Sequence, residues 1–113
     1  VQWESYHPDK LEKAAQAGTP VVLDFYADWC VPCLELDRIT FTNEEVISAL
    51  QSYRTIKVDL TDYESPEAEA IRKKFGVAGV PTIIFLNKNG IEIKESRVVG
   101  FVGAKEFLKR IPE

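Results

Sequence analysis

The sequence predicts an α/β domain in which a central mixed β-sheet is flanked by helices on both faces. Helix-like and strand-like segments alternate along most of the chain, which favours parallel strands joined through helices. One segment, PVVLDFYA at 20–27, is a dense apolar run typical of a buried central strand. Near the end, Asn89-Gly90 is a hairpin signal, which adds antiparallel pairing and makes the sheet mixed.

Five segments carry helix signals. They lie at 8–17, at 31–39, from Thr42 onward, at 65–76 and at 104–111. The third is expected to begin with a capping box formed by Thr42 and Glu45. The fourth has the fullest set of signals, because Ser65 suits the N-cap, Pro66 suits the first turn and Gly76 suits the end.

Strand patterns follow the dense run at 20–27. They cover 55–60 and 82–86, and then 91–95 as the second arm of the predicted hairpin. The segment RVVGF at 97–101 is either a further strand or the end of that arm. We therefore expect one domain over residues 1–113, excised from a longer protein, since the chain holds no methionine and starts at Val1.

Composition limits the classes of partner. An apolar share of 45% with 28% charged residues is ordinary for a globular domain, which we expect to be soluble and monomeric. Lysine and arginine number 14 against 18 acidic residues, a formal net charge of −4. An acidic surface argues against nucleic acid or an anionic membrane as partner.

The two cysteines, Cys30 and Cys33, are separated by two residues. A structural zinc site takes four ligands, and with His7 this chain offers only three candidates, so no metal is predicted. A disulfide closing so short a loop restrains little unfolded-state entropy, so stability is a poor reason for it. Thiol–disulfide exchange remains the leading interpretation, with no cofactor beyond the cysteine pair.

Cys30 falls where the predicted central strand ends and a helix begins. Backbone N–H groups at a helix N-terminus favour a thiolate, so Cys30 is the predicted exchanging cysteine, partly exposed, and Cys33 the buried resolving one. Pro32 is tolerated in a first turn and stiffens the loop. Trp29 offers a flat apolar docking surface; core packing is the alternative.

The segment DFYADWCVPC at 24–33 resembles the active site of the thioredoxin superfamily, and GVPT at 79–82 resembles its cis-proline loop. Further matches point to the C-terminal thioredoxin-like domain of the DsbD family of transmembrane thiol–disulfide reductases. They are YADWC, the acids at 35 and 37, Thr40-Phe41, GVPT, and Val98 to Phe101, and the resemblance as a whole covers the chain from Trp3 to Ile111. Pro32 departs from some members of that family and is closer to general thioredoxins.

This resemblance implies a thioredoxin fold and an electron relay on the periplasmic side, tethered to the inner membrane. The implied electron donor is a membrane-embedded domain and the implied acceptor an extracytoplasmic protein or domain. It also implies a cis peptide bond before Pro81. Partner binding is expected to involve Trp29, Val31, Pro32, Val80 and Pro81.

Two acids accompany the cysteines as predicted site residues. Asp24 interrupts the buried run and resembles the acid that assists proton transfer at the resolving cysteine of thioredoxins; a hydrogen-bonded structural acid is the alternative. Asp37 follows Cys30 by seven residues, two helical turns, so it lies on the cysteine side, whereas Glu35 points to solvent. Both charges should raise the pKa of the Cys30 thiol. Lys57 either pairs with Asp24 or extends to the surface.

Three classes of function follow. The first is the relay domain just described. The second is a free or membrane-tethered thioredoxin-like reductase, for example one that serves cytochrome c maturation. The third, an interaction module without exchange activity, is disfavoured because both cysteines, Asp24, Trp29 and Pro81 are all present.

Overall fold

The computed structural model describes residues 1–112. In chain order the elements are β1 (Glu4–Ser5), α1 (Pro8–Ala17), β2 (Val21–Tyr26), α2 (Val31–Glu35), η1 (Leu36–Thr40), α3 (Glu44–Ala49), β3 (Arg54–Asp59), α4 (Pro66–Phe75), β4 (Thr82–Leu86), η2 (Lys94–Ser96), β5 (Val98–Val99) and α5 (Ala104–Arg110). Element η1 is a π-helix that continues α2, and η2 is a single 3₁₀ turn. The predicted mixed α/β architecture is confirmed.

The sheet has five strands in the order β1-β3-β2-β4-β5. Strands β1, β3 and β2 run parallel, while β4 is antiparallel to β2 and β5 is antiparallel to β4. The dense apolar strand β2 therefore lies at the centre, as its composition predicts. Its pairing with β3 places Asp24 directly opposite Lys57.

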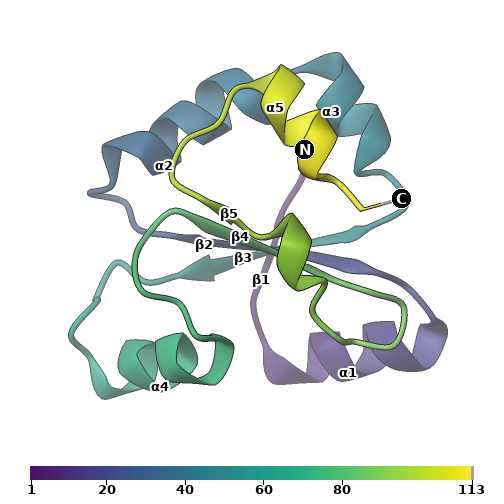
Figure 1. Ribbon diagram of the computed structural model, residues 1–113. Helices are drawn as coiled ribbons and strands as arrows, with labels where there is room; N and C mark the ends of the chain where they lie inside the picture. The colour runs from purple at the N-terminus through teal and green to yellow at the C-terminus, as the bar shows by residue number, and fades with distance from the viewer. Residues whose placement is uncertain (113) are drawn as a thin grey trace.

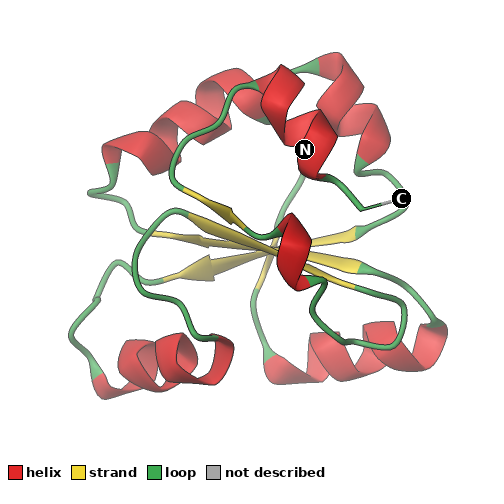
Figure 2. Ribbon diagram, in the orientation of Figure 1, coloured by secondary structure: helices red, strands yellow, loops and turns green. Residues whose placement is uncertain are grey.

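Helices cover both faces of the sheet (Figures 1 and 2). Helices α1 and α4 lie on one face, and α2, α3 and α5 lie on the other (Figure 1). Alternate residues of β2 divide between two cores: Leu23 and Phe25 pack in the core that includes α1 and α4, whereas Val22 packs with Phe85 and Phe107 in the other. By the same alternation Asp24 faces the side of α2, α3 and α5.

Most helix ends follow the predicted signals. Ser65 Oγ accepts a hydrogen bond from Ala68 N–H at the start of α4, and Gly76 ends it in the left-handed conformation, with φ at 64°. The predicted capping box of α3 is wrong. Asn43 is its N-cap and accepts from the N–H groups of Glu45 and Val46, whereas the Thr42 hydroxyl donates to the Arg38 carbonyl.

The second arm predicted for the hairpin is also wrong. The turn forms, with the Asn87 side chain accepting from Asn89 and Ile91 N–H groups, but the strand beyond it is reduced to one bridge between Leu86 and Glu92. The Glu92 carboxylate instead bonds Arg97, and η2 turns the chain away from the sheet. The strand that pairs antiparallel with β4 on the side away from β2 is therefore β5, within the segment 97–101.

Strand β1 has no counterpart among the predicted elements. Its two residues, Glu4 and Ser5, are polar and too few to show a period, so only the pairing with β3 defines it. The Glu4 carboxylate accepts two hydrogen bonds from Arg54, at 2.7 and 2.9 Å, which fixes this edge. The charge-assisted pair lowers the pKa of Glu4 below its ordinary value.

Candidate active site

Cys30 and Cys33 form a disulfide at the carboxyl end of β2. Cys30 is the N-cap of α2, and its sulfur accepts a hydrogen bond from the Cys33 N–H at 3.2 Å. The Cα atoms of the two cysteines lie 5.3 Å apart. The predicted position of Cys30 at a helix start is confirmed, and a thiolate released there by reduction would keep a backbone donor.

Burial of the two cysteines is nearly equal in this oxidised state. Cys30 is 4% exposed and Cys33 is 3% exposed. Cys33 is buried as predicted, but the predicted partial exposure of Cys30 is wrong, because Ala27 and Val80 pack around the pair. An attacking thiol must therefore approach past the residues described next.

The loop before β4 borders the disulfide on one side. The Val80–Pro81 peptide bond is cis, as the resemblance implies, and Val80 packs against the cysteine cluster. The Pro81 carbonyl accepts a hydrogen bond from Gly100 N–H at 3.0 Å, which brings the end of β5 to this loop. Gly100 has φ at 85°, a conformation that favours glycine. Val99 beside it is 70% exposed.

Trp29 directly precedes Cys30 in the chain. It is 56% exposed, so core packing does not account for it, and its indole N–H donates to the Thr61 carbonyl at 2.9 Å. The Asp28 N–H donates to the Thr61 hydroxyl. Val31 and Pro32 are exposed next to the cysteines. The five predicted partner-binding residues thus gather around the disulfide, and their role in binding remains a prediction.

Asp24 is buried inside the sheet face that α2 and η1 cover. Its Oδ1 has no hydrogen-bond partner among residues 1–112. Burial raises the pKa of Asp24 from its ordinary 3.8 to about 7; the Lys57 charge works against this rise and the Asp37 charge adds to it. A carboxyl group that titrates near neutral pH is suited to accept and return a proton.

Asp37 lies on η1 and is half-buried, and Glu35 is exposed as predicted. That Asp37 faces the cysteines stays a prediction. Lys57 Nζ donates to both Asp37 oxygens, at 2.9 and 3.0 Å. The same ammonium lies 4.7 Å from the centre of the Tyr26 ring. Neither position predicted for Lys57 is fully correct. Lys57 lies opposite Asp24 in the sheet, but its ammonium group hydrogen-bonds Asp37.

Three residues that support Trp29, directly or through Tyr63, were not predicted. They are Thr61, Tyr63 and Arg72, which follow β3 or lie on α4. Parallel neighbouring strands end at the same sheet edge, so residues just after β3 necessarily lie beside those just after β2. That topological signal was available, but it identifies no particular side chain.

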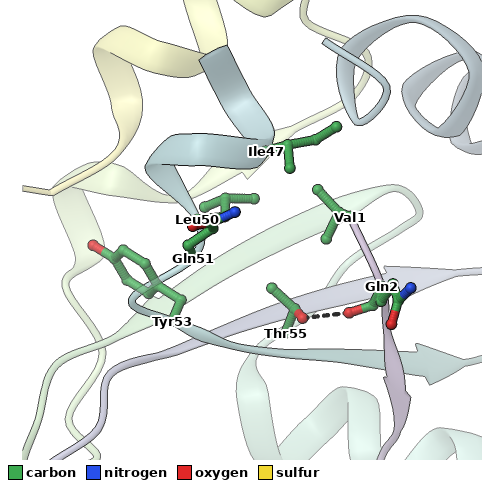
Figure 3. A pocket seen from close by; sticks show the side chains of 7 residues that line it. All are labelled: Val1, Gln2, Ile47, Leu50, Gln51, Tyr53 and Thr55. Carbon is green, nitrogen blue, oxygen red and sulfur yellow. Dashed lines mark hydrogen bonds between the residues drawn. The ribbon is translucent and has the colours of Figure 1, made fainter. Parts of the chain in front are cut away.

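The hollow drawn in Figure 3 is not part of this site. It has a volume of about 410 Å³ and is lined by residues of the amino-terminal segment, α3 and the start of β3. Figure 3 shows Val1, Ile47 and Tyr53 around it, with the Thr55 hydroxyl donating to the Gln2 carbonyl. Because β2 and β3 are parallel, the start of β3 is at the opposite end of the sheet from the cysteines.

Comparison with known proteins agrees with the geometry. Residues 7–113 match the family described as the thioredoxin-like domain. The chain belongs to this family. It is 47% identical over 100 residues to the thiol:disulfide interchange protein DsbD of Klebsiella pneumoniae, covering 87% of this chain and 17% of that protein. It is 43% identical over 94 residues to the DsbD of Actinobacillus pleuropneumoniae, covering 83% and 16%.

A solved structure gives the same result. The oxidised DsbD C-terminal domain of Neisseria meningitidis is 34% identical, with a TM-score of 0.74, covering 89% of this chain and 83% of that one. The fold is therefore a thioredoxin fold, and a Cys-x-x-Cys disulfide on it makes this domain a thiol–disulfide oxidoreductase module. The chain spans only about one sixth of the full-length relatives it matches.

Over residues 1–112, no three histidine, cysteine or acidic side chains are grouped so that they could hold a metal ion. No helix in the same range has both the length and the apolar character needed to cross a membrane.

Proposed function

We propose that this domain relays electrons by dithiol–disulfide exchange, from a membrane-embedded cysteine pair to extracytoplasmic partner proteins. The observation that carries the proposal is the Cys30–Cys33 disulfide at the start of α2, in a chain similar to the C-terminal domain of DsbD. The short share of DsbD that this chain covers fits one module of a longer relay. We place it on the periplasmic side, tethered to the inner membrane.

The exchange has two steps in each direction. In the reduced domain, the Cys30 thiolate attacks one sulfur of the acceptor disulfide, forms a mixed disulfide and releases the other sulfur as a thiolate. Cys33 then attacks the Cys30 sulfur, which frees the second acceptor thiolate and regenerates the disulfide. Asp24 takes the proton that Cys33 loses. The membrane-embedded dithiol later reduces Cys30–Cys33 by the same chemistry and is itself oxidised.

The test is to trap the intermediate. Cys33→Ser removes the resolving thiol, so the reduced variant should accumulate a mixed disulfide between Cys30 and its partners in a preparation of membranes and periplasm. Non-reducing electrophoresis with mass spectrometry identifies what is bound, and Cys30→Ser is the matched control. Trapping by Cys30→Ser in place of Cys33→Ser would reverse the two roles.

A second candidate is a free or membrane-tethered reductase, for example one serving cytochrome c maturation. It is favoured by Pro32, because a proline at this position between the two cysteines resembles general thioredoxins more than some DsbD relatives. The same trap separates the candidates. A relay yields adducts with a membrane protein that has its own cysteine pair, whereas the alternative yields adducts with secreted or haem-binding substrates alone.

A further inference from the structure

Tyr63 contacts both segments that frame the disulfide. Its ring meets the Trp29 ring edge-on, with centroids 5.9 Å apart and planes at 71°. Its hydroxyl donates to the Ala78 carbonyl at 3.2 Å. Ala78 is two residues before Val80, in the short loop that leads from α4 to the cis bond. One side chain thus joins Trp29 to the loop that leads to Pro81.

Arg72 holds Tyr63 from α4. The centre of its guanidinium lies 4.0 Å from the Tyr63 ring centre, and its Nη2 donates to the Tyr63 carbonyl at 2.9 Å. The cation therefore fixes both the ring and the backbone of Tyr63. Its Nε has no hydrogen-bond partner among residues 1–112. Arg72 leaves that donor unpaired in a position that keeps the guanidinium stacked on the ring.

Trp29 has a second support beside Tyr63. The Thr61 carbonyl accepts from the indole N–H, and Thr61 is held by Asp59, whose Oδ1 accepts from the Thr61 N–H at 2.9 Å. Thr61 thus holds the indole at its nitrogen and Tyr63 contacts its ring, although more than half of Trp29 is exposed. An exposed aromatic side chain held in one orientation loses little entropy when a partner docks.

We propose that Tyr63, supported by Arg72, is a positioning residue that fixes Trp29 relative to the Val80–Pro81 loop and so favours extended peptide disulfides over small ones. An extended segment can pair with the backbone at Val80 only while its flanks fit between that loop and Trp29. A small disulfide needs no such fit. This inference rests on the exchange activity proposed above, but not on the identity of the natural partners.

The experiment compares two probes with the same leaving group. One is the mixed disulfide of cysteine with thionitrobenzoate, and the other carries the same disulfide in the middle of an extended ten-residue peptide. Each probe takes two electrons from the reduced domain, which gives a thiol, coloured thionitrobenzoate and the Cys30–Cys33 disulfide. The measured quantity is the ratio of the peptide rate constant to the small-probe rate constant.

Tyr63→Phe deletes the bond to Ala78 and keeps the ring, so the ratio should fall about fivefold, while the small-probe rate stays within about twofold. Arg72→Met and Tyr63→Leu should lower the ratio further. In a Trp3→Phe background, Tyr63→Leu should also weaken the near-ultraviolet dichroism of Trp29. Tyr53→Phe, which alters a hydroxyl bonded to the Pro112 carbonyl, is the matched control and should leave the ratio unchanged.

The outcomes are separable. An unchanged ratio in Tyr63→Phe and Arg72→Met, with both variants folded, overturns the positioning role. A fall in stability with an unchanged ratio also overturns it, since that is what packing alone would give. Failure of the wild-type domain to react with the small probe would instead reject the proposed exchange activity. If Tyr63→Leu does not fold, the ratio of rate constants measured for Tyr63→Phe still tests the positioning role.

Discussion

The two acidic residues predicted for the site, Asp24 on strand β2 and Asp37 on helix η1, have different surroundings in the fold. Asp24, on β2, is 2% exposed and its Oδ1 has no partner within residues 1–112. Asp37, on η1, is half-buried and both of its oxygens accept from Lys57. The difference indicates that Asp24 is the group able to change its charge near neutral pH, whereas Asp37 is held as half of an ion pair.

The largest expected effect concerns stability and its dependence on pH. Folding raises the pKa of Asp24 from 3.8 to about 7, so the folded state binds this proton more tightly than the unfolded state does. Between about pH 4 and pH 7 the free energy of unfolding should therefore fall as pH rises, by on the order of 4 kcal/mol from this group. Asp24→Asn removes this titrating group. At pH 8 the free energy of unfolding of the oxidised variant should therefore exceed that of the wild type by about that amount.

Urea unfolding of both oxidised proteins at pH 4 and pH 8 measures this difference. Near pH 4 the two should agree within about 1 kcal/mol, because protonated aspartic acid and asparagine are both neutral. Glu35→Gln is the control on an exposed helix position. A stability gain of Asp24→Asn that is equal at both pH values would mean that Asp24 is not the titrating group.

The second effect concerns the reactivity of Cys30 in the reduced domain. A buried charge opposes a second anion nearby, so Asp24→Asn should speed alkylation of Cys30 by iodoacetamide, by roughly three- to tenfold at pH 8. The acceleration should shrink at pH 6, where Asp24 in the wild type is mostly protonated. An acceleration independent of pH would assign it to altered packing.

How far these features follow from sequence depends on the range of the interactions involved. The apolar run of β2 and the caps of α4 are local signals, and the structure agrees with both. The spacing along one helix likewise separates Asp37 from Glu35. The bond between Lys57 and Asp37 joins a strand to a helix 20 residues away and depends on the tertiary arrangement of those two elements.

The carboxyl-terminal third shows the same limit. Residues 91–95 alternate as a strand should, yet the structure gives them a single bridge. Glu92 is drawn to Arg97, which also donates to the Phe75 and Gly76 carbonyls at the end of α4. The ion pair of Glu92 with Arg97, which also caps α4, thus outweighs the strand-like alternation of residues 91–95. This long-range contact cannot be inferred from the sequence of 91–95 alone.

The third effect tests the position of Lys57 between the two acids. Lys57 opposes the rise in the pKa of Asp24, so Lys57→Met should raise the pKa of Asp24 above its wild-type value. Carbon-13 NMR of the Asp24 carboxyl group during a pH titration of the oxidised domain measures it directly. Lys74→Met, an exposed lysine on α4, is the control and should leave that titration in place. A fall in the pKa of Asp24 in Lys57→Met would contradict the assignment.

The smallest effect is expected for Asp37→Asn. The Lys57–Asp37 pair is partly exposed, with side chains 20% and 34% accessible, so its loss should change the free energy of unfolding by no more than about 1 kcal/mol. The pKa of Asp24 should fall, because the Asp37 charge is gone and Lys57, opposite Asp24 in the sheet, loses its partner.

Alkylation of Cys30 then ranks the two carboxylates. Asp37→Asn should accelerate it less than Asp24→Asn, because Lys57 already offsets the Asp37 charge in the wild type and a half-buried charge is better screened. Added salt should reduce the Asp37 effect more than the Asp24 effect. Glu35→Gln carries the same change of charge on the exposed face and should do least. Equal acceleration by Asp37→Asn and Asp24→Asn would mean that Lys57 does not neutralise Asp37, and the contrast between the two acids would fail.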